Sequence, residues 1–293
     1  MGLAMRRQKP LDWATLGPIA VLLGLLLLIV NQLNQPKNQY APLSAYFNDA
    51  AASVPQSQLT PLPPTTLQAI EQSNAAGSSN QIDLVLEAEL YQDQSNELAS
   101  ELQIALDYVQ ERTNIRLAER VTVVISQDAQ CGFHGVTYSD VRVIYIYSCA
   151  GVARSRVVNI AAHEFVHQLE QDRYGAAHLS TDLVLSEGFA TWGAGRYWLG
   201  SASDFTSFAR DYQANGQALP LATHYAGVGI DGMNVLYYQW ASFVDYLINN
   251  YGREAFDQLY ISGGERQPGA ANYAAIYNRS FGLLEAEWRQ TLD

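Results

Sequence analysis

The spacing of hydrophobic residues predicts strands early in the folded part of this chain and helices after them. Residues 82–90 and the β-branched run 121–126 have the composition of strands, and residues 135–138 and 141–148 predict an antiparallel hairpin. Between the first two strands, residues 95–115 carry apolar residues at helical spacing. The rest of the chain keeps this helical spacing, over residues 156–175, 186–198, 202–213, 234–252 and 280–292. Strands that come first and helices that follow indicate the α+β class.

The N-terminal residues follow a different pattern. Residues 13–30 contain no charged side chain, and at about 1.5 Å per residue they extend about 27 Å, close to the hydrocarbon thickness of a bilayer. No small-residue cleavage pattern follows Val30, which favours an uncleaved transmembrane anchor over the alternative, a cleaved signal peptide. Three basic residues precede the span, so residues 1–12 are predicted to be cytoplasmic and the chain after the span extracytoplasmic.

Residues 31–80 have the composition of a linker. They are rich in Gln, Asn, Ser and Ala, and they hold six of the ten prolines. Their few large apolar residues could not build a core, so we expect one folded domain over residues 81–293.

The balance of charge argues against a nucleic-acid partner. The chain has 17 Lys and Arg residues against 29 Asp and Glu residues, a formal net charge of −12. Backbone phosphates need a basic surface, which this composition does not supply. The sequence carries no signal for an oligomeric state.

The two cysteines, Cys131 and Cys149, are placed symmetrically about the predicted hairpin, whose three-residue loop is Ser139, Asp140 and Val141. A disulfide between opposite positions of two antiparallel strands fits this placement. An extracytoplasmic location also favours oxidation. The sequence therefore predicts a Cys131–Cys149 disulfide, with two unrelated buried thiols as the alternative.

The stretch AAHEFVHQLE, residues 161–170, carries two of the five histidines four positions apart. On a helix these positions share one face, so His163 and His167 can present their imidazole nitrogens to a single metal ion. Glu164 lies beside that face, where a carboxylate can reach a metal-bound water and act as a general base. Two surface histidines are the alternative, but the apolar flanks predict a buried helix, in which histidines need partners.

A catalytic zinc ion needs a third protein ligand and one open position. The metzincin arrangement is absent, because Glu170 and Arg173 stand where a glycine and a third histidine would follow the motif. Glu187, twenty residues after His167, lies on a second apolar helical pattern, and two antiparallel helices could bring its carboxylate to the ion. Asp182, on the connecting segment, is the fallback ligand.

The motif HEFVH followed by LSEGFATW resembles the gluzincin metallopeptidases. The segment LYYQWASFVDYLINNYG resembles the helix that carries their catalytic tyrosine, and the chain is most similar to the compact peptidase-MA-like domains of bacteria, which end in a helix like SFGLLEAEWRQTL. The resemblance covers about residues 81–293 and implies a zincin-like fold.

The resemblance also implies a role for each site residue. It makes His163, His167 and Glu187 the ligands of one Zn²⁺ ion and Glu164 the general base. It makes Tyr237 the residue that stabilises the oxyanion, with Tyr238 as the fallback.

Two departures from the family pattern limit what the resemblance implies. The Gly-x-Met-Glu-Asn signature of aminopeptidase gluzincins is absent, which favours endopeptidase action. Thr191 stands where thermolysin-like enzymes place a carboxylate that orients a ligand, so that orienting network must differ or come from elsewhere. His134, His178 and His224 are predicted to be loop histidines, with His224 the one that could line a cleft.

The function expected from these residues is that of a membrane-anchored, extracytoplasmic zinc peptidase acting on a peptide or protein substrate. We expect residues 141–148 to form the rim of the cleft and to pair with an extended peptide. The alternative is a catalytically silent zincin-fold binding or sensory module, and the presence of Glu164 favours the enzyme. A purely structural zinc is disfavoured, because such sites are closed by four ligands, usually including Cys.

Overall fold

The computed structural model describes residues 81–87, 89–132 and 134–293. The predicted N-terminal segment (1–12), anchor (13–30) and linker (31–80) therefore lie outside the described residues. Within the described ranges, the structure contains no helix with the length and apolar character needed to cross a membrane.

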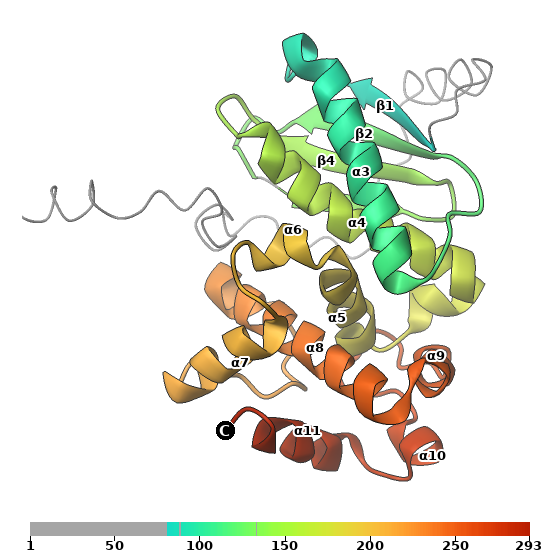
Figure 1. The fold of residues 1–293 in the computed structure, drawn as a ribbon, viewed down its shortest axis with the longest axis vertical. Helices are drawn as coiled ribbons and strands as arrows, with labels where there is room; N and C mark the ends of the chain where they lie inside the picture. Colours follow the sequence, from blue (N-terminus) through green and yellow to red (C-terminus); the bar gives the residue numbers. More distant parts are fainter. Residues whose placement is uncertain (1–80, 88, 133) are drawn as a thin grey trace, which may run out of the picture. The chain divides into compact units, whose positions relative to one another are not determined.

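The described part of the chain is α+β, as predicted: a four-stranded mixed sheet comes first and a mostly helical region follows (Figure 1). The strand order is β1-β2-β4-β3, with β1, β2 and β4 parallel and β3 antiparallel to β4. Their bounds are β1 Ile82–Leu86, β2 Val121–Gln127, β3 His134–Tyr138 and β4 Val143–Ser148. The order places β4 inside the sheet and β3 at its edge.

This order corrects one expectation. Residues 141–148 were expected to form a free rim, but β4 pairs with β2 on one side and with β3 on the other. Its run of buried residues is typical of an interior strand, which has no free backbone edge for a peptide. The strand β3 lies at an edge of the sheet and contacts the helix that carries the HEFVH motif.

The hairpin loop is also longer than predicted. Tyr138 pairs with Val143, so four residues separate β3 from β4 instead of three. Arg142 accounts for the difference: its backbone is left-handed, with φ 58°, and its guanidinium binds the Asp172 carboxylate and two backbone carbonyls near β2. These bonds hold Arg142 in the turn.

The predicted disulfide is confirmed, since Cys131 and Cys149 are bonded, with their Cα atoms 5.2 Å apart. Both cysteines lie just beyond the paired ends of β3 and β4. The bond closes the open end of the hairpin.

Two helices cover one face of the sheet. Helices α3 (Ser95–Thr113) and α4 (Arg154–Tyr174) lie side by side across it (Figure 1). Because strand side chains alternate between faces, every second residue of β2 and β4 points to these helices and belongs to the main core: Val121, Val123, Ile125, Ile144 and Ile146. The opposite face carries a smaller cluster around Val124, Val143 and Tyr145.

In the described part of the chain, all but one of the remaining helices follow α4. They are η6 Gly175–Ser180, α5 Leu183–Ala194, α6 Arg196–Leu199, α7 Phe205–Ala214, α8 Gly229–Tyr251, α9 Arg253–Tyr260, α10 Tyr273–Tyr277 and α11 Phe281–Gln290, and a short η5 Gln92–Gln94 precedes α3. The predicted helix 186–198 is divided at Gly195, whose φ of 46° ends α5.

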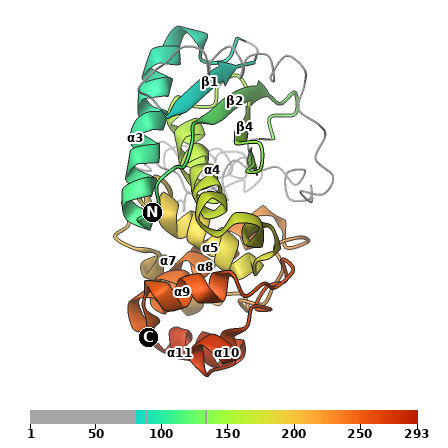
Figure 2. The same cartoon turned by 90° about the vertical axis from the view of Figure 1, so that its right-hand side faces the viewer.

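Helix α5 lies at the centre of this region. It packs against α4 on one side and α8 on the other (Figures 1 and 2), and nearly all of its residues are buried. Gly188 permits the close approach of α8, because a Cβ atom there would lie 2.8 Å from the backbone oxygen of Trp240. Residues on α4 and α8 thus face those on α5 from two sides.

Candidate metal centre

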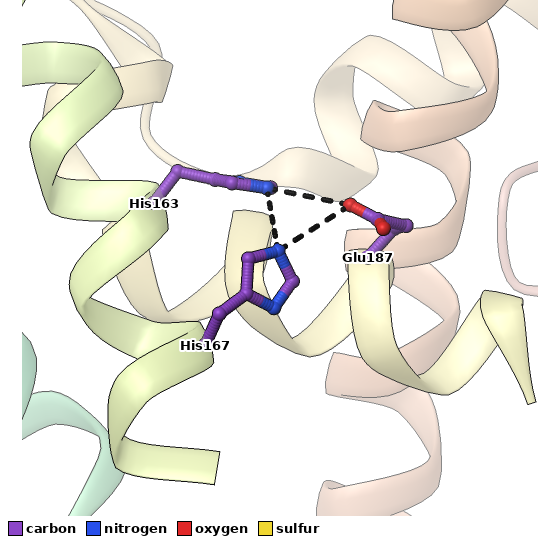
Figure 3. A group of neighbouring side chains, drawn as sticks. All are labelled: His163, His167 and Glu187. Atoms are coloured by element: carbon purple, nitrogen blue, oxygen red, sulfur yellow. Dashed lines mark hydrogen bonds and ion pairs between the residues drawn. The ribbon is translucent and has the colours of Figure 1, made fainter. Parts of the chain in front are cut away.

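Three side chains from two neighbouring helices converge on one point. His163 and His167 lie one turn apart on α4, and their Nε2 atoms are 3.2 Å apart. Glu187 on α5 directs its Oε2 atom to both, at 3.4 Å from His163 Nε2 and 3.6 Å from His167 Nε2 (Figure 3). The three residues predicted as ligands are therefore brought together, and this group could hold a metal ion.

The electrostatics of the group also fit a cation. His163 and Glu187 are buried. Burial opposes ionisation of Glu187, but the histidines and Arg266 outweigh it and hold the pKa of Glu187 well below its usual range. In the same way Glu170 and Glu187 outweigh burial and hold the pKa of His167 well above its usual range. Buried anionic charge of this kind is stabilised by a bound cation.

Glu170 orients His167. Its Oε2 atom lies 2.7 Å from His167 Nδ1, which leaves the Nε2 atom of that ring directed at Glu187. Glu170 is fully buried. Besides His167, its carboxylate lies near His178, whose Nδ1 atom is 3.6 Å from Glu170 Oε2, and near the Tyr260 side chain. Glu170, His167 and His178 also form a second group that could hold an ion, although Glu170 Oε2 already binds His167 Nδ1.

Thr191 does not supply the carboxylate that thermolysin-like enzymes place at the corresponding position. The Thr191 hydroxyl lies 3.5 Å from His163 Nδ1 and carries no charge. A carboxylate orients the other histidine: Glu170, one turn after His167 on the same helix, binds His167 Nδ1. Its spacing of three residues from His167 on one helix face is the sequence signal for this contact.

The edge strand β3 holds Glu164 in place. Thr137 donates its hydroxyl to Glu164 Oε2 at 2.7 Å, and Glu164 is only 7% exposed. Gly135 lies against the same side chain, since a Cβ atom there would be 2.6 Å from Glu164 Cγ. Thr137 and Gly135 were not identified from the sequence, because nothing in a sequence pattern shows which strand crosses the helix.

Tyr237 on α8 reaches the candidate metal centre, and Tyr238 does not. The Tyr237 ring lies parallel to the His163 ring, at 4° and 5.8 Å between centroids. Burial, with the nearby charges of Glu187 and Glu164, raises the pKa of Tyr237 well above its usual value, so its phenol is a neutral hydrogen-bond donor. Tyr238 donates to the Trp198 carbonyl at 2.7 Å in the core.

Asp182, the fallback ligand, has another use. Its carboxylate caps α5 by accepting from Val184 N at 2.9 Å, and it also accepts from the backbone of Gly269 and Ala271 and from the Tyr273 hydroxyl, each at 3.0 Å. It belongs to neither group of potential metal ligands found in the described part of the chain.

The three remaining histidines differ from one another. His178 is buried in η6 rather than in an exposed loop, and burial lowers its pKa to about 3. His134 begins β3 and stacks on Tyr147 with ring centroids 4.6 Å apart. His224 is exposed in the loop before α8, beside Tyr225.

Arg266 was not anticipated. Its guanidinium donates to Glu187 Oε1 at 3.1 Å, although the two residues are 79 positions apart.

No protein-family model matches this chain, and no curated protein matches it significantly. The group of His163, His167 and Glu187 is therefore interpreted from its own chemistry.

Proposed function

We propose that this chain is a zinc-dependent peptidase of the gluzincin type with a zincin-like fold. The observation that carries the proposal is the convergence of His163 Nε2, His167 Nε2 and Glu187 Oε2, no two of which are more than 3.6 Å apart. Two imidazole nitrogens and one carboxylate oxygen form a ligand set used by catalytic zinc, which leaves a position for water or substrate. One Zn²⁺ ion would be held by these three residues.

The surrounding residues suit peptide hydrolysis. A bound zinc ion supplies a Lewis acid that polarises a carbonyl group and lowers the pKa of water toward ~7. Glu164, oriented by Thr137, would take a proton from the attacking water and deliver it to the leaving amine. Tyr237, as a neutral donor beside His163, would stabilise the charge that develops on the carbonyl oxygen.

An extended peptide is the substrate that best fits this arrangement. The edge strand β3 contacts Glu164 through Thr137, so a peptide added along β3 would bring its backbone to the metal group. Backbone pairing of this kind tolerates many sequences.

We also propose an extracytoplasmic location, a transmembrane anchor at residues 13–30 and endopeptidase action.

The second candidate is a binding or sensory module that keeps the metal without turnover. A module of that kind has no need of a positioned base, whereas Glu164 is buried and hydrogen-bonded beside the metal group. The two functions differ in what they predict for Glu164→Gln: a peptidase loses turnover, whereas a binding module has no turnover to lose.

The test is metal content together with cleavage of an unbiased peptide library by the purified full-length chain. Glu164→Gln keeps all three ligands, so it should retain zinc while kcat falls at least ~100-fold. Glu187→Ala removes an anionic ligand, so zinc affinity and activity should both fall steeply. Glu254→Gln, an exposed position on α9, is the matched control and should change neither. Parental kcat in Glu164→Gln, or parental zinc affinity in Glu187→Ala, would contradict the proposal.

A further inference from the structure

The two oxygens of Glu187 have separate partners. Oε2 faces His163 and His167, whereas Oε1 accepts a hydrogen bond from Arg266 Nη2 at 3.1 Å. The Glu187 side chain is 9% exposed, so solvent contributes little to its orientation, and the guanidinium is the main partner of Oε1. A carboxylate held by one oxygen presents the other to a metal ion.

The backbone around Arg266 is held in an uncommon conformation. Four consecutive residues between α9 and α10 have positive φ angles: Gly263 91°, Gly264 136°, Glu265 48° and Arg266 56°. Glycine adopts these angles readily, but Glu265 and Arg266 carry Cβ atoms that disfavour them. Such angles persist only where surrounding contacts hold them, and they are found preferentially at functional positions.

Those contacts come from the residues directly before α5. Thr181 pairs with Gly264, and its backbone oxygen accepts from Arg266 N at 3.2 Å. Asp182 accepts from Gly269 N and Ala271 N, each at 3.0 Å. The loop that presents Arg266 is thereby fastened to the start of the helix that carries Glu187.

We propose that Arg266 is a positioning residue of the metal centre, which fixes Glu187 Oε1 so that Oε2 alone binds the ion. The inference rests on the proposed metal site. Without the guanidinium, Glu187 could rotate to offer both oxygens or neither. The positive charge of Arg266 also draws electron density from the carboxylate, which acts against metal binding. The gain in metal affinity from a fixed carboxylate orientation outweighs this loss, because residues that hold metal ligands typically contribute 10–100-fold to affinity.

The test measures metal binding alone, on the purified full-length chain. Arg266→Met keeps an unbranched apolar stem but removes the charge and the donors, so Zn²⁺ affinity should fall about 10–100-fold in competition with a chromophoric chelator. Arg266→Lys keeps one charged donor and should restore most of the affinity. The visible spectrum of the Co²⁺-loaded protein should change in the Met variant, because its bands report the coordination of the ion.

Arg279→Met is the matched control, since Arg279 pairs with Glu287, a residue of α11 outside the metal centre, at 3.0 Å. It should leave zinc affinity within about twofold of the parent, while thermal unfolding of the metal-free proteins measures stability separately. Parental zinc affinity in Arg266→Met overturns the inference. Equal losses in Arg266→Met and Arg266→Lys that match their loss of thermal stability also overturn it, because they show a structural role. If Glu187→Ala binds zinc as tightly as the parent, the metal site itself is wrong and the inference falls with it.

Discussion

At the scale of single residues, the chemistry of Tyr237 is set by its neighbours. Burial raises its pKa, and the carboxylates of Glu187 and Glu164 raise it further, because a phenolate beside them would add a third negative charge. The phenol therefore stays protonated at neutral pH. A protonated phenol beside the candidate metal centre can donate a hydrogen bond to a developing oxyanion.

The corresponding prediction is that Tyr237→Phe retains the metal and lowers kcat by roughly 10²-fold, through loss of one oxyanion donor. Peptide cleavage and metal content measured on the same preparation would check it. Tyr238→Phe is the control: it removes the bond to the Trp198 carbonyl and should lower thermal stability with kcat nearly unchanged. Unchanged kcat in Tyr237→Phe would assign Tyr237 to packing alone.

The three candidate ligands could be predicted from the sequence to lie together, but most of their partners could not. His163 and His167 share a helical face because the helix repeat is fixed, and Glu187 follows on a second apolar helix. Thr137 and Arg266 come from a strand and a loop whose positions depend on the tertiary fold. Two L-residues in left-handed conformations, as at Glu265 and Arg266, also leave no signal in a hydrophobic pattern.

At the scale of elements, the junction of β3 and α4 positions Glu164, the proposed general base. Gly135 has no side chain, and this allows the β3 backbone to lie directly against Glu164 and Ile160. A Cβ atom at this position would be 2.6 Å from Glu164 Cγ, Glu164 Oε1 and Ile160 Cγ2. Either the strand or the Glu164 side chain must move to admit it.

We therefore expect Gly135→Ala to bind metal as the parent does and to lose activity. Misplacement of a catalytic group by about 1 Å can cost on the order of 10²-fold in rate, so kcat should fall at least ~10-fold. Steady-state kinetics with a metal-content assay would measure this. Gly282→Ala on α11, where a Cβ atom would meet nothing within 4 Å, is the control and should be fully active. Full activity in Gly135→Ala would show that this contact does not position Glu164.

Whether a segment forms a helix or a strand was more predictable than the residues at which it begins and ends. The helical spacing of residues 95–115 and 156–175 corresponds closely to α3 and α4, because a buried face repeats along the whole element. The three-residue hairpin loop was wrong because the long-range bonds of Arg142 determine the turn. The strand β4 was misplaced at the rim because strand order depends on pairing between distant segments.

At the scale of the described residues as a whole, one polar cluster fastens three helices. Asp257 on α9 accepts from Arg173 and from Tyr174 at 2.6 Å, both at the end of α4, and from Arg253 at 2.7 Å. Arg253 also donates to the Thr113 carbonyl at the end of α3, at 2.5 Å. The cluster joins α3 and α4, the helices that cover the sheet, to α9, the helix that precedes Arg266 in the chain.

The last prediction concerns the pH dependence of this cluster. Burial raises the pKa of Asp257, but Arg173, Arg253 and Tyr174 outweigh it and hold the pKa below its usual value. Folding therefore favours the ionised form, and this stabilisation is fully present above the unfolded-state pKa of about 3.9 and is lost as the pH falls through the lower folded-state value.

Asp257→Asn should accordingly destabilise the protein by on the order of 1–3 kcal/mol at pH 7, since it removes the charged acceptor. Thermal unfolding of parent and variant from pH 8 to pH 3 would measure the difference. The gap in Tm should stay constant down to about pH 5 and shrink below about pH 4, where the parental carboxylate takes up its proton. Asp140→Asn, in the exposed hairpin turn, should show no such gap. A gap for Asp257→Asn that is as wide at pH 3 as at pH 7 would mean that packing, and not the charge of Asp257, joins these helices.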